Sequence, residues 1–138
     1  MSLAVRCNGL VKSYGEARAV DGVSLRVEQG RTLALLGPSG CGKTTTLRLL
    51  AGFERPDAGL IQIGGRTVFG PGVDVAPEAR GVGMVFQDLA LFPHLSVRDN
   101  VGFGLPARQR KARAAELLEL VGLSRHAARL PHELSGGE

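Results

Sequence analysis

Apolar residues in the first third of the chain follow the short-range pattern of β-strands. Aliphatic runs at 3–7, 23–27 and 32–36 are separated by glycine-containing turns. Residues 23–27 alternate between apolar and polar side chains, which predicts a strand with one buried face. The run 32–36 is aliphatic at every position after Thr32, and this predicts a central strand covered on both faces.

Further along the chain the pattern changes to helical spacing. A helix is expected at 43–51, with Leu47, Leu50 and Ala51 on one side and Gly52 at its end. A second and clearer helix is expected at 107–121, stopped by Gly122.

Shorter elements fill the region between these helices. Segments 60–63 and 67–69 can pair as a hairpin across two glycines, and 82–86 is predicted to be another strand. Ser96 is followed three residues later by Asp99, the spacing of a capping box, so a helix is expected to start there.

Composition narrows the protein class without identifying a function. The chain has 138 residues, of which 43% are hydrophobic and 22% charged, and its net charge is +4. These values are typical of one globular domain and argue against disorder and coiled coil. The basic run at 108–113 contains no aromatic residue, so we interpret it as a solvated helix face and expect no nucleic-acid partner.

Targeting, membrane and metal signals are absent from the sequence. It shows neither a secretory signal nor an apolar run long enough to cross a bilayer, so we expect a soluble, cytosolic chain. Cys7 and Cys41 lie far apart, and the three histidines lack metal-ligand spacing.

A glycine-rich segment carries the main chemical signal. Residues 37–44 fit the phosphate-loop (P-loop) pattern of glycine, four residues, glycine, lysine and then serine or threonine, between a predicted strand and a predicted helix. Backbone amides in such a loop converge on a phosphate, a lysine reaches the β- and γ-phosphates, and the hydroxyl that follows ligates Mg²⁺. We therefore predict that a nucleoside triphosphate, ATP or GTP, is bound through Gly37, Pro38, Ser39, Gly40, Cys41, Gly42, Lys43, Thr44 and Thr45.

Cys41 leaves two interpretations open. Its place beside Lys43 and a helix N-terminus favours the thiolate, which would make it a reactive thiol protected by nucleotide. It is equally an inert small side chain within the loop.

Three further segments occur with the P-loop in a specific order. They are 12–15 (Lys-Ser-Tyr-Gly), 85–95 (Val-Phe-Gln-Asp and the Leu-Phe-Pro-His-Leu that follows) and 134–138 (Leu-Ser-Gly-Gly-Glu). In this order the chain resembles the ATPases of ATP-binding cassette (ABC) transporters over almost its whole length. The resemblance implies an α/β P-loop NTPase core with an N-terminal antiparallel β subdomain and part of the helical subdomain. Residues 1–86 would form the β subdomain and P-loop core, and 87–138 the Q-loop and the helical subdomain up to the signature.

The resemblance also assigns roles to individual residues. Tyr14 matches the aromatic residue that stacks on adenine, and Gln87 matches the glutamine that ligates Mg²⁺ and positions the attacking water. Lys43 and Gln87 are then the catalytic residues, and Thr44 and Gln87 the metal ligands. The signature residues Ser135, Gly136 and Gly137 would contact ATP held by a second ATPase subunit, in a head-to-tail dimer. Glu138 stands where the family more often has Gln.

Within the family, 83–97 looks like the importer branch that works with periplasmic binding proteins. The segments 71–80 and 100–105 most resemble ferric iron, polyamine and sulfate importers, and ferric iron is favoured. The implied partners are membrane permease subunits, contacted through the Q-loop region, and indirectly a periplasmic or extracellular binding protein. The implied location is the cytoplasmic face of the inner membrane, as a peripheral subunit.

The family's remaining catalytic groups follow the signature, on the Walker B strand. Since no residues supply them, we expect the chain to be the N-terminal portion of a longer ATPase that alone does not turn over ATP. Without that strand, 32–36 and 82–86 should expose apolar surface. A non-transport cassette ATPase, or a truncated fragment that binds nucleotide weakly, remain alternatives.

Overall fold

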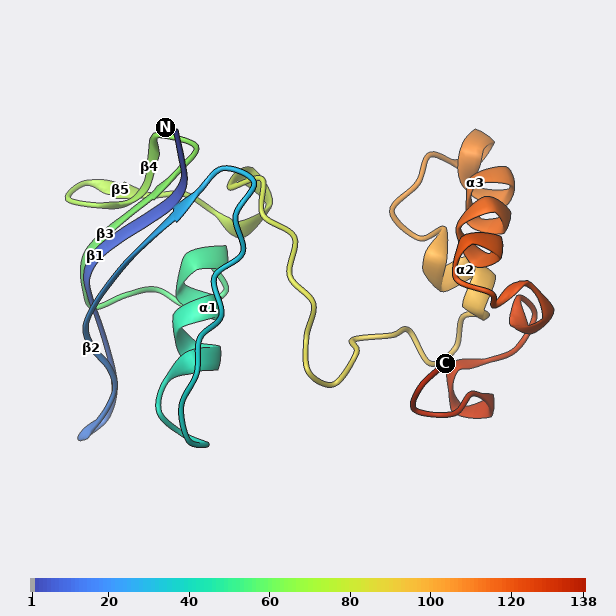
Figure 1. The fold of residues 1–138 in the computed structure, drawn as a ribbon, viewed down its shortest axis with the longest axis horizontal. Coiled ribbons are helices and arrows are strands. Elements are labelled where there is room, and N and C mark those ends of the chain that lie inside the picture. The colour runs from blue at the N-terminus through green and yellow to red at the C-terminus, as the bar shows by residue number, and fades with distance from the viewer. Residues whose placement is uncertain (1) are drawn as a thin grey trace. The chain divides into compact units, whose positions relative to one another are not determined.

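A computed structural model describes residues 2–138, which divide into two compact units. The first unit extends to Met84, and the second spans Val85–Glu138 (Figure 1). The chain of the first unit forms a β-sheet and one helix, whereas that of the second forms helices and turns.

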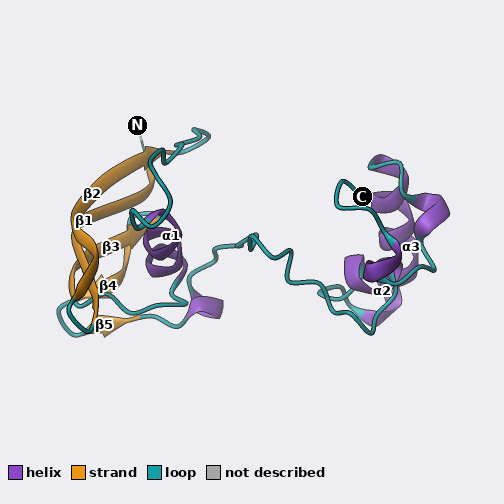
Figure 2. Cartoon of the chain, turned by 90° about the horizontal axis from the view of Figure 1, so that it is seen from below, coloured by secondary structure: helices purple, strands orange, loops and turns teal. Residues whose placement is uncertain are grey.

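The first unit is built on a five-stranded antiparallel sheet (Figure 2). The strand order is β2-β1-β3-β4-β5, and every neighbouring pair is antiparallel. This confirms the N-terminal antiparallel β subdomain expected from the sequence. The strands are β1 (Leu3–Tyr14), β2 (Ala17–Glu28), β3 (Ala58–Ile63), β4 (Arg66–Gly70) and β5 (Val73–Asp74).

Two hairpins account for most of the sheet. Strands β1 and β2 are longer than the runs predicted for them, and Tyr14 pairs with Ala17 across the turn that joins them. The predicted hairpin between β3 and β4 is confirmed. Its central residues Gly64 and Gly65 have φ angles of 54° and 80°, the left-handed conformation that a tight hairpin turn requires.

Helix α1 (Lys43–Ala51) packs on this sheet, and its bounds confirm the prediction. Leu49 is fully buried with Leu10, Val20 and Ile61 from three strands. The predicted buried side was partly wrong, because Leu47 is 49% exposed. The helix turns Thr46 and Leu49 toward the sheet, and Leu47 lies about 100° further round the helix from Thr46.

Two predicted strands are not formed. Neither 32–36 nor 82–86 is a strand, and neither has a neighbouring strand among the residues that the structure describes. An extended segment needs such a neighbour for its backbone hydrogen bonds. As expected, both segments expose apolar side chains: Leu36 and Val85 are each 91% exposed.

Arg80 fastens the end of α1 to the loop that follows the sheet. Its side chain is only 1% exposed. Nη1 donates to the carbonyls of Leu49 (2.9 Å) and Leu50 (3.1 Å), and Nε donates to Val75 O at 2.7 Å. Burial lowers the pKa of this guanidinium, and Asp74, 3.5 Å away, offsets part of that effect. The arginine therefore supplies partners to carbonyls in the last turn of the helix.

The second unit holds α2 (Val97–Val101) and α3 (Ala107–Leu120). Ser96 caps α2 by accepting a hydrogen bond from the amide of Asp99, as its spacing predicts. Helix α3 ends at the predicted place, where Gly122 adopts a φ of 72°. Single 3₁₀ turns occur at Pro77–Ala79 in the first unit and at Ser124–His126 and Pro131–Glu133 in the second. Within residues 2–138, every helix is too short or too polar to cross a membrane.

Replacing Arg80 with Met should lower the free energy of unfolding by about 2–4 kcal/mol, since buried carbonyls of α1 would lose their charged donor. Arg55→Met is the matched control. Arg55 pairs with the same Asp74 at 3.1 Å, but its side chain is 76% exposed, so its loss should cost about 1 kcal/mol or less. Urea denaturation measures both, and equal effects would contradict the role given to Arg80.

Candidate nucleotide-binding site

The P-loop joins residue 36 to α1 through glycines in left-handed conformations. Gly40 and Gly42 have φ angles of 81° and 90°. A Cβ atom on Gly42 would lie 2.1 Å from the carbonyl oxygen of Ala19. Only glycine permits this approach, which brings the start of α1 against β2.

The N-terminus of α1 offers backbone donors to an anion. Thr46 is the first residue of the helix whose amide has a helical partner, the carbonyl of Gly42 at 2.8 Å. Gly42, the N-cap residue, has no side chain that could accept hydrogen bonds from the amides between Gly42 and Thr46. The N–H groups of Lys43, Thr44 and Thr45 therefore stand at the positive end of the helix, where phosphate binds favourably.

Lys43 adds a full positive charge to these donors. Its Nζ donates to the carbonyls of Gly37 (2.8 Å) and Pro38 (2.7 Å), so the ammonium group lies against the glycine-rich loop. Cys41 Sγ is 3.4 Å from the same nitrogen and is exposed, and both interpretations of this thiol stay open. The sequence pattern and the geometry together place one cation and several free amides at one point.

Tyr14 lies at the tip of the β1–β2 hairpin. Its side chain is 47% exposed, and Lys12 Nζ lies 5.3 Å from the centre of the ring. Asp57 holds this end of β1, because its Oδ2 accepts from the amide of Ser13 at 2.7 Å and its Oδ1 is 3.7 Å from Lys12 Nζ. Asp57 thus fixes the backbone next to Tyr14, and the exposed part of the ring is available for stacking.

The hairpin tip and the P-loop lie at the same end of β2. Tyr14 pairs with Ala17, and Gly42 approaches Ala19 two residues further along that strand. Figure 1 shows the hairpin tip and the loop that precedes α1 at the same end of the first unit. An aromatic ring and a phosphate loop so placed can meet the two ends of one nucleotide.

A magnesium ion at this site would depend on few protein ligands. Among the described residues there is no group of three or more His, Cys, Asp or Glu that could hold a metal ion. Thr44 is exposed in the first turn of α1, beside the amides that face the phosphate. This fits Mg²⁺, which commonly takes one or two protein ligands together with phosphate oxygens and water.

Gln87 belongs to the second unit, where it is exposed at the start of a turn. Its role at the metal and the attacking water stays a prediction. Asn100, which the sequence analysis missed, orders the segment between Gln87 and α2. Asn100 Oδ1 accepts from the amide of Phe92 (2.9 Å), and its Nδ2 donates to the carbonyls of Phe92 (3.1 Å) and Leu95 (3.0 Å). The only sequence signal for this was an asparagine four residues after the capping Ser96.

The signature residues lie in an exposed turn of the second unit. The amide and the hydroxyl of Ser135 both donate to Oε2 of Glu138, each at 2.9 Å. A Cβ atom on Gly136 or Gly137 would meet nothing within 4 Å, so this side of the turn is open. The sequence analysis missed the contact between Ser135 and Glu138. The signal that could have found it is their spacing, which is that of a capping box.

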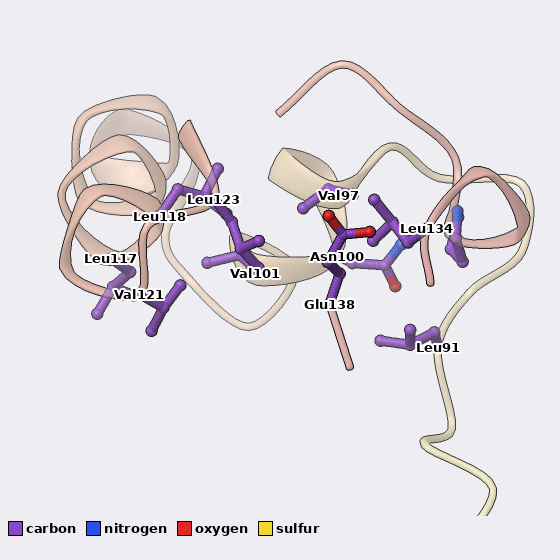
Figure 3. A pocket seen from close by; sticks show the side chains of 11 residues that line it. Leu91, Val97, Asn100, Val101, Leu117, Leu118, Val121, Leu123, Leu134 and Glu138 are labelled. Carbon is purple, nitrogen blue, oxygen red and sulfur yellow. The ribbon is translucent and has the colours of Figure 1, made fainter. Parts of the chain in front are cut away.

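An apolar pocket of about 280 Å³ lies beside this turn (Figure 3). Its wall is almost entirely aliphatic, which suits packing against another apolar surface and not phosphate binding. The lining residues are Leu91, Val97, Asn100, Val101, Leu117, Leu118, Val121, Leu123, Pro131, Leu134 and Glu138.

Curated proteins similar to this chain are import ATP-binding proteins. The chain is 56% identical to the Fe(3+) ions import ATP-binding protein FbpC 1 of Rhodococcus jostii, and the match covers 100% of this chain and 40% of that protein. It is 48% identical to the spermidine/putrescine import ATP-binding protein PotA of Nitratidesulfovibrio vulgaris (97% of this chain, 37% of that protein). It is also 48% identical to the sulfate/thiosulfate import ATP-binding protein CysA of Mycobacterium bovis (100% and 40%). The chain thus spans about 40% of the length of these relatives.

A solved structure has the same fold. It is the dimeric ATP-binding cassette MJ0796 in a post-hydrolysis state with ADP and Pi, 28% identical, with a TM-score of 0.81 over 96% of this chain and 64% of that one. The family profile described as ABC transporter matches residues 20–138. With its P-loop ahead of α1 and its Leu-Ser-Gly-Gly turn, the chain belongs to the ABC transporter family of ATP-binding proteins.

Proposed function

We propose that this protein is the ATP-binding subunit that energises solute import by an ABC transporter. One observation carries the proposal: the Lys43 ammonium and the unpaired amides of the first turn of α1 meet at one glycine-rich loop. That arrangement suits a polyphosphate, since it combines a cation with the backbone dipoles at the start of a helix. The identity to import ATP-binding proteins supports the transport role.

In the proposed mechanism, the first unit binds the nucleotide. Tyr14 stacks on the base, the P-loop amides and Lys43 bind the phosphates, and Thr44 binds the Mg²⁺ that accompanies them. The metal neutralises charge on the phosphate oxygens when it is bound. Gln87 would complete the metal site and orient the attacking water in the whole protein.

A second ATPase subunit completes the proposed assembly. In a head-to-tail dimer, Ser135, Gly136 and Gly137 of one copy contact the ATP held by the other. The dimeric cassette MJ0796, a similar solved structure, supports the formation of a dimer. Hydrolysis of ATP is proposed for a protein of the length of its curated relatives. This chain matches about 40% of the length of the relative named FbpC 1.

Ferric iron is the proposed solute. The relative named for Fe(3+) import is 56% identical, against 48% to 51% for the polyamine relatives and 48% for the sulfate relative, which remain the second choices. The proposed partners are permease subunits contacted by Gln87 and the 91–95 segment, and indirectly an extracytoplasmic binding protein. The proposed place is the cytoplasmic face of the inner membrane.

Uptake of ferric iron tests the proposed solute. A strain that lacks the gene should regain radiolabelled ferric iron uptake with the natural gene and not with one carrying Lys43→Ala. Unchanged iron uptake in the deletion strain, with loss of spermidine or sulfate uptake, would overturn the iron proposal and retain the transport class.

Lys43→Ala should weaken ATP binding by about tenfold or more, because the substitution removes the cation from the loop. Titration with a fluorescent ATP analogue measures the affinity. Lys111→Ala, on the exposed surface of α3, is the control and should bind as the natural protein does. Equal affinity of the two variants would contradict the phosphate role of Lys43.

Tyr14→Ala should weaken ATP binding by about fivefold, whereas Tyr14→Phe should retain the affinity, because stacking needs the ring and not the hydroxyl. The same titration tests both variants. Stacking is contradicted if alanine binds as tightly as phenylalanine.

A further inference from the structure

Both hydrogen-bond donors of Ser135 are already engaged by an anion within the chain. The amide and the hydroxyl each lie 2.9 Å from Oε2 of Glu138, and the amide of Glu138 closes the turn on Ser135 O at 3.0 Å. A serine hydroxyl has a single hydrogen, so while it donates to Glu138 it has none for another acceptor. The carboxylate therefore occupies the donors that a phosphate oxygen would need.

The second carboxylate oxygen of Glu138 lies beside a buried histidine. His126 Nε2 lies 3.2 Å from Oε1, and His126 is only 5% exposed. Arg125 Nε donates to the same His126 nitrogen at 3.0 Å, so the arginine brings positive charge close to the carboxylate. The hydrogen bonds from the amide and the hydroxyl of Ser135 are the main cause of a lowered pKa at Glu138, and His126 and Arg125 add to it. Glu138 is thus charged at neutral pH, accepts both hydrogen bonds from Ser135 and lies beside a buried histidine.

The carboxylate of Glu138 also borders the apolar pocket. Figure 3 shows the side chain of Glu138 among the residues that line this pocket. Its side chain is 29% exposed. A negative charge at this position repels a second anion that approaches Ser135.

We propose that Glu138 is a positioning residue of the signature that acts as an internal anion. It holds the donors of Ser135 until the ATP phosphate of a second copy displaces it, and so sets the affinity of the nucleotide-bound dimer. The inference rests on the proposed function, because it needs the head-to-tail arrangement in which Ser135 meets that phosphate.

Glutamine at this position separates charge from shape. Glu138→Gln keeps the length of the side chain and one oxygen acceptor for the Ser135 amide. Its NH₂ group can donate to Ser135 Oγ, which leaves the hydroxyl hydrogen free for phosphate. Under our proposal glutamine strengthens nucleotide-dependent dimerisation. If Glu138 only stabilised the turn, the loss of its charge-assisted hydrogen bonds would weaken dimerisation or leave it unchanged.

The experiment measures dimerisation of the protein by analytical ultracentrifugation with saturating ATP and EDTA, so that hydrolysis does not interfere. Glu138→Gln should lower the dimer dissociation constant about tenfold, and Glu138→Ala should also lower it. Glu133→Gln is the matched control, since Glu133 Oε2 accepts from the amide of Leu130 at 2.7 Å in the same kind of contact, away from Ser135. That control should dimerise as the natural protein does.

Three results would overturn the proposal. Dimerisation of Glu138→Gln equal to or weaker than that of the natural protein means that the carboxylate does not compete with phosphate. A matching change in Glu133→Gln means that lost charge anywhere in the segment has this effect. If the natural protein binds ATP but forms no ATP-dependent dimer, the head-to-tail arrangement itself is wrong. ATP affinity of the monomers, measured separately at low protein concentration, should be equal in all variants and shows whether the nucleotide site is intact.

Discussion

Helix α1 is held at both of its ends, and the nucleotide site depends on this constraint. At its start, Gly42 lies so close to Ala19 O that any side chain would push the helix away from β2. At its end, Arg80 donates to two carbonyls of the last turn from a buried position. Between them Leu49 is fully buried against the sheet. The amides and the cation that face phosphate are therefore placed by packing of the whole first unit.

Much of this unit could be predicted from local patterns. The bounds of α1, the Gly64–Gly65 hairpin and the Ser96 cap depend on glycine conformations and short-range hydrogen bonds, which are readable in sequence. The segments 32–36 and 82–86 were predicted wrongly because an apolar run forms a strand only when other strands flank it. The exposure of Leu47 depends on which face of α1 packs against Val20 and Ile61. That face is set by tertiary packing, and the helical period alone does not determine it.

The candidate site could be predicted in its residue types and less in its contacts. The P-loop pattern names Lys43, but the bonds of its ammonium group to two loop carbonyls come from the three-dimensional path of the loop. The Leu-Ser-Gly-Gly-Glu motif names Ser135, but nothing in its pattern indicated that His126 would lie behind Glu138. The two elements predicted to bind phosphate thus differ in charge: a cation lies in the P-loop, and a carboxylate lies on the signature turn.

The most direct test of the account is to find which backbone amides meet the nucleotide. Two-dimensional NMR of the isotope-labelled protein during an ATP titration should show large shifts for the amides of Gly42, Lys43, Thr44 and Thr45, and for the side chain of Tyr14. Adenosine without phosphates should leave the amides of the loop unshifted. Shifts confined to other parts of the chain, or an equal response of the loop amides to adenosine and to ATP, would contradict phosphate binding at the start of α1.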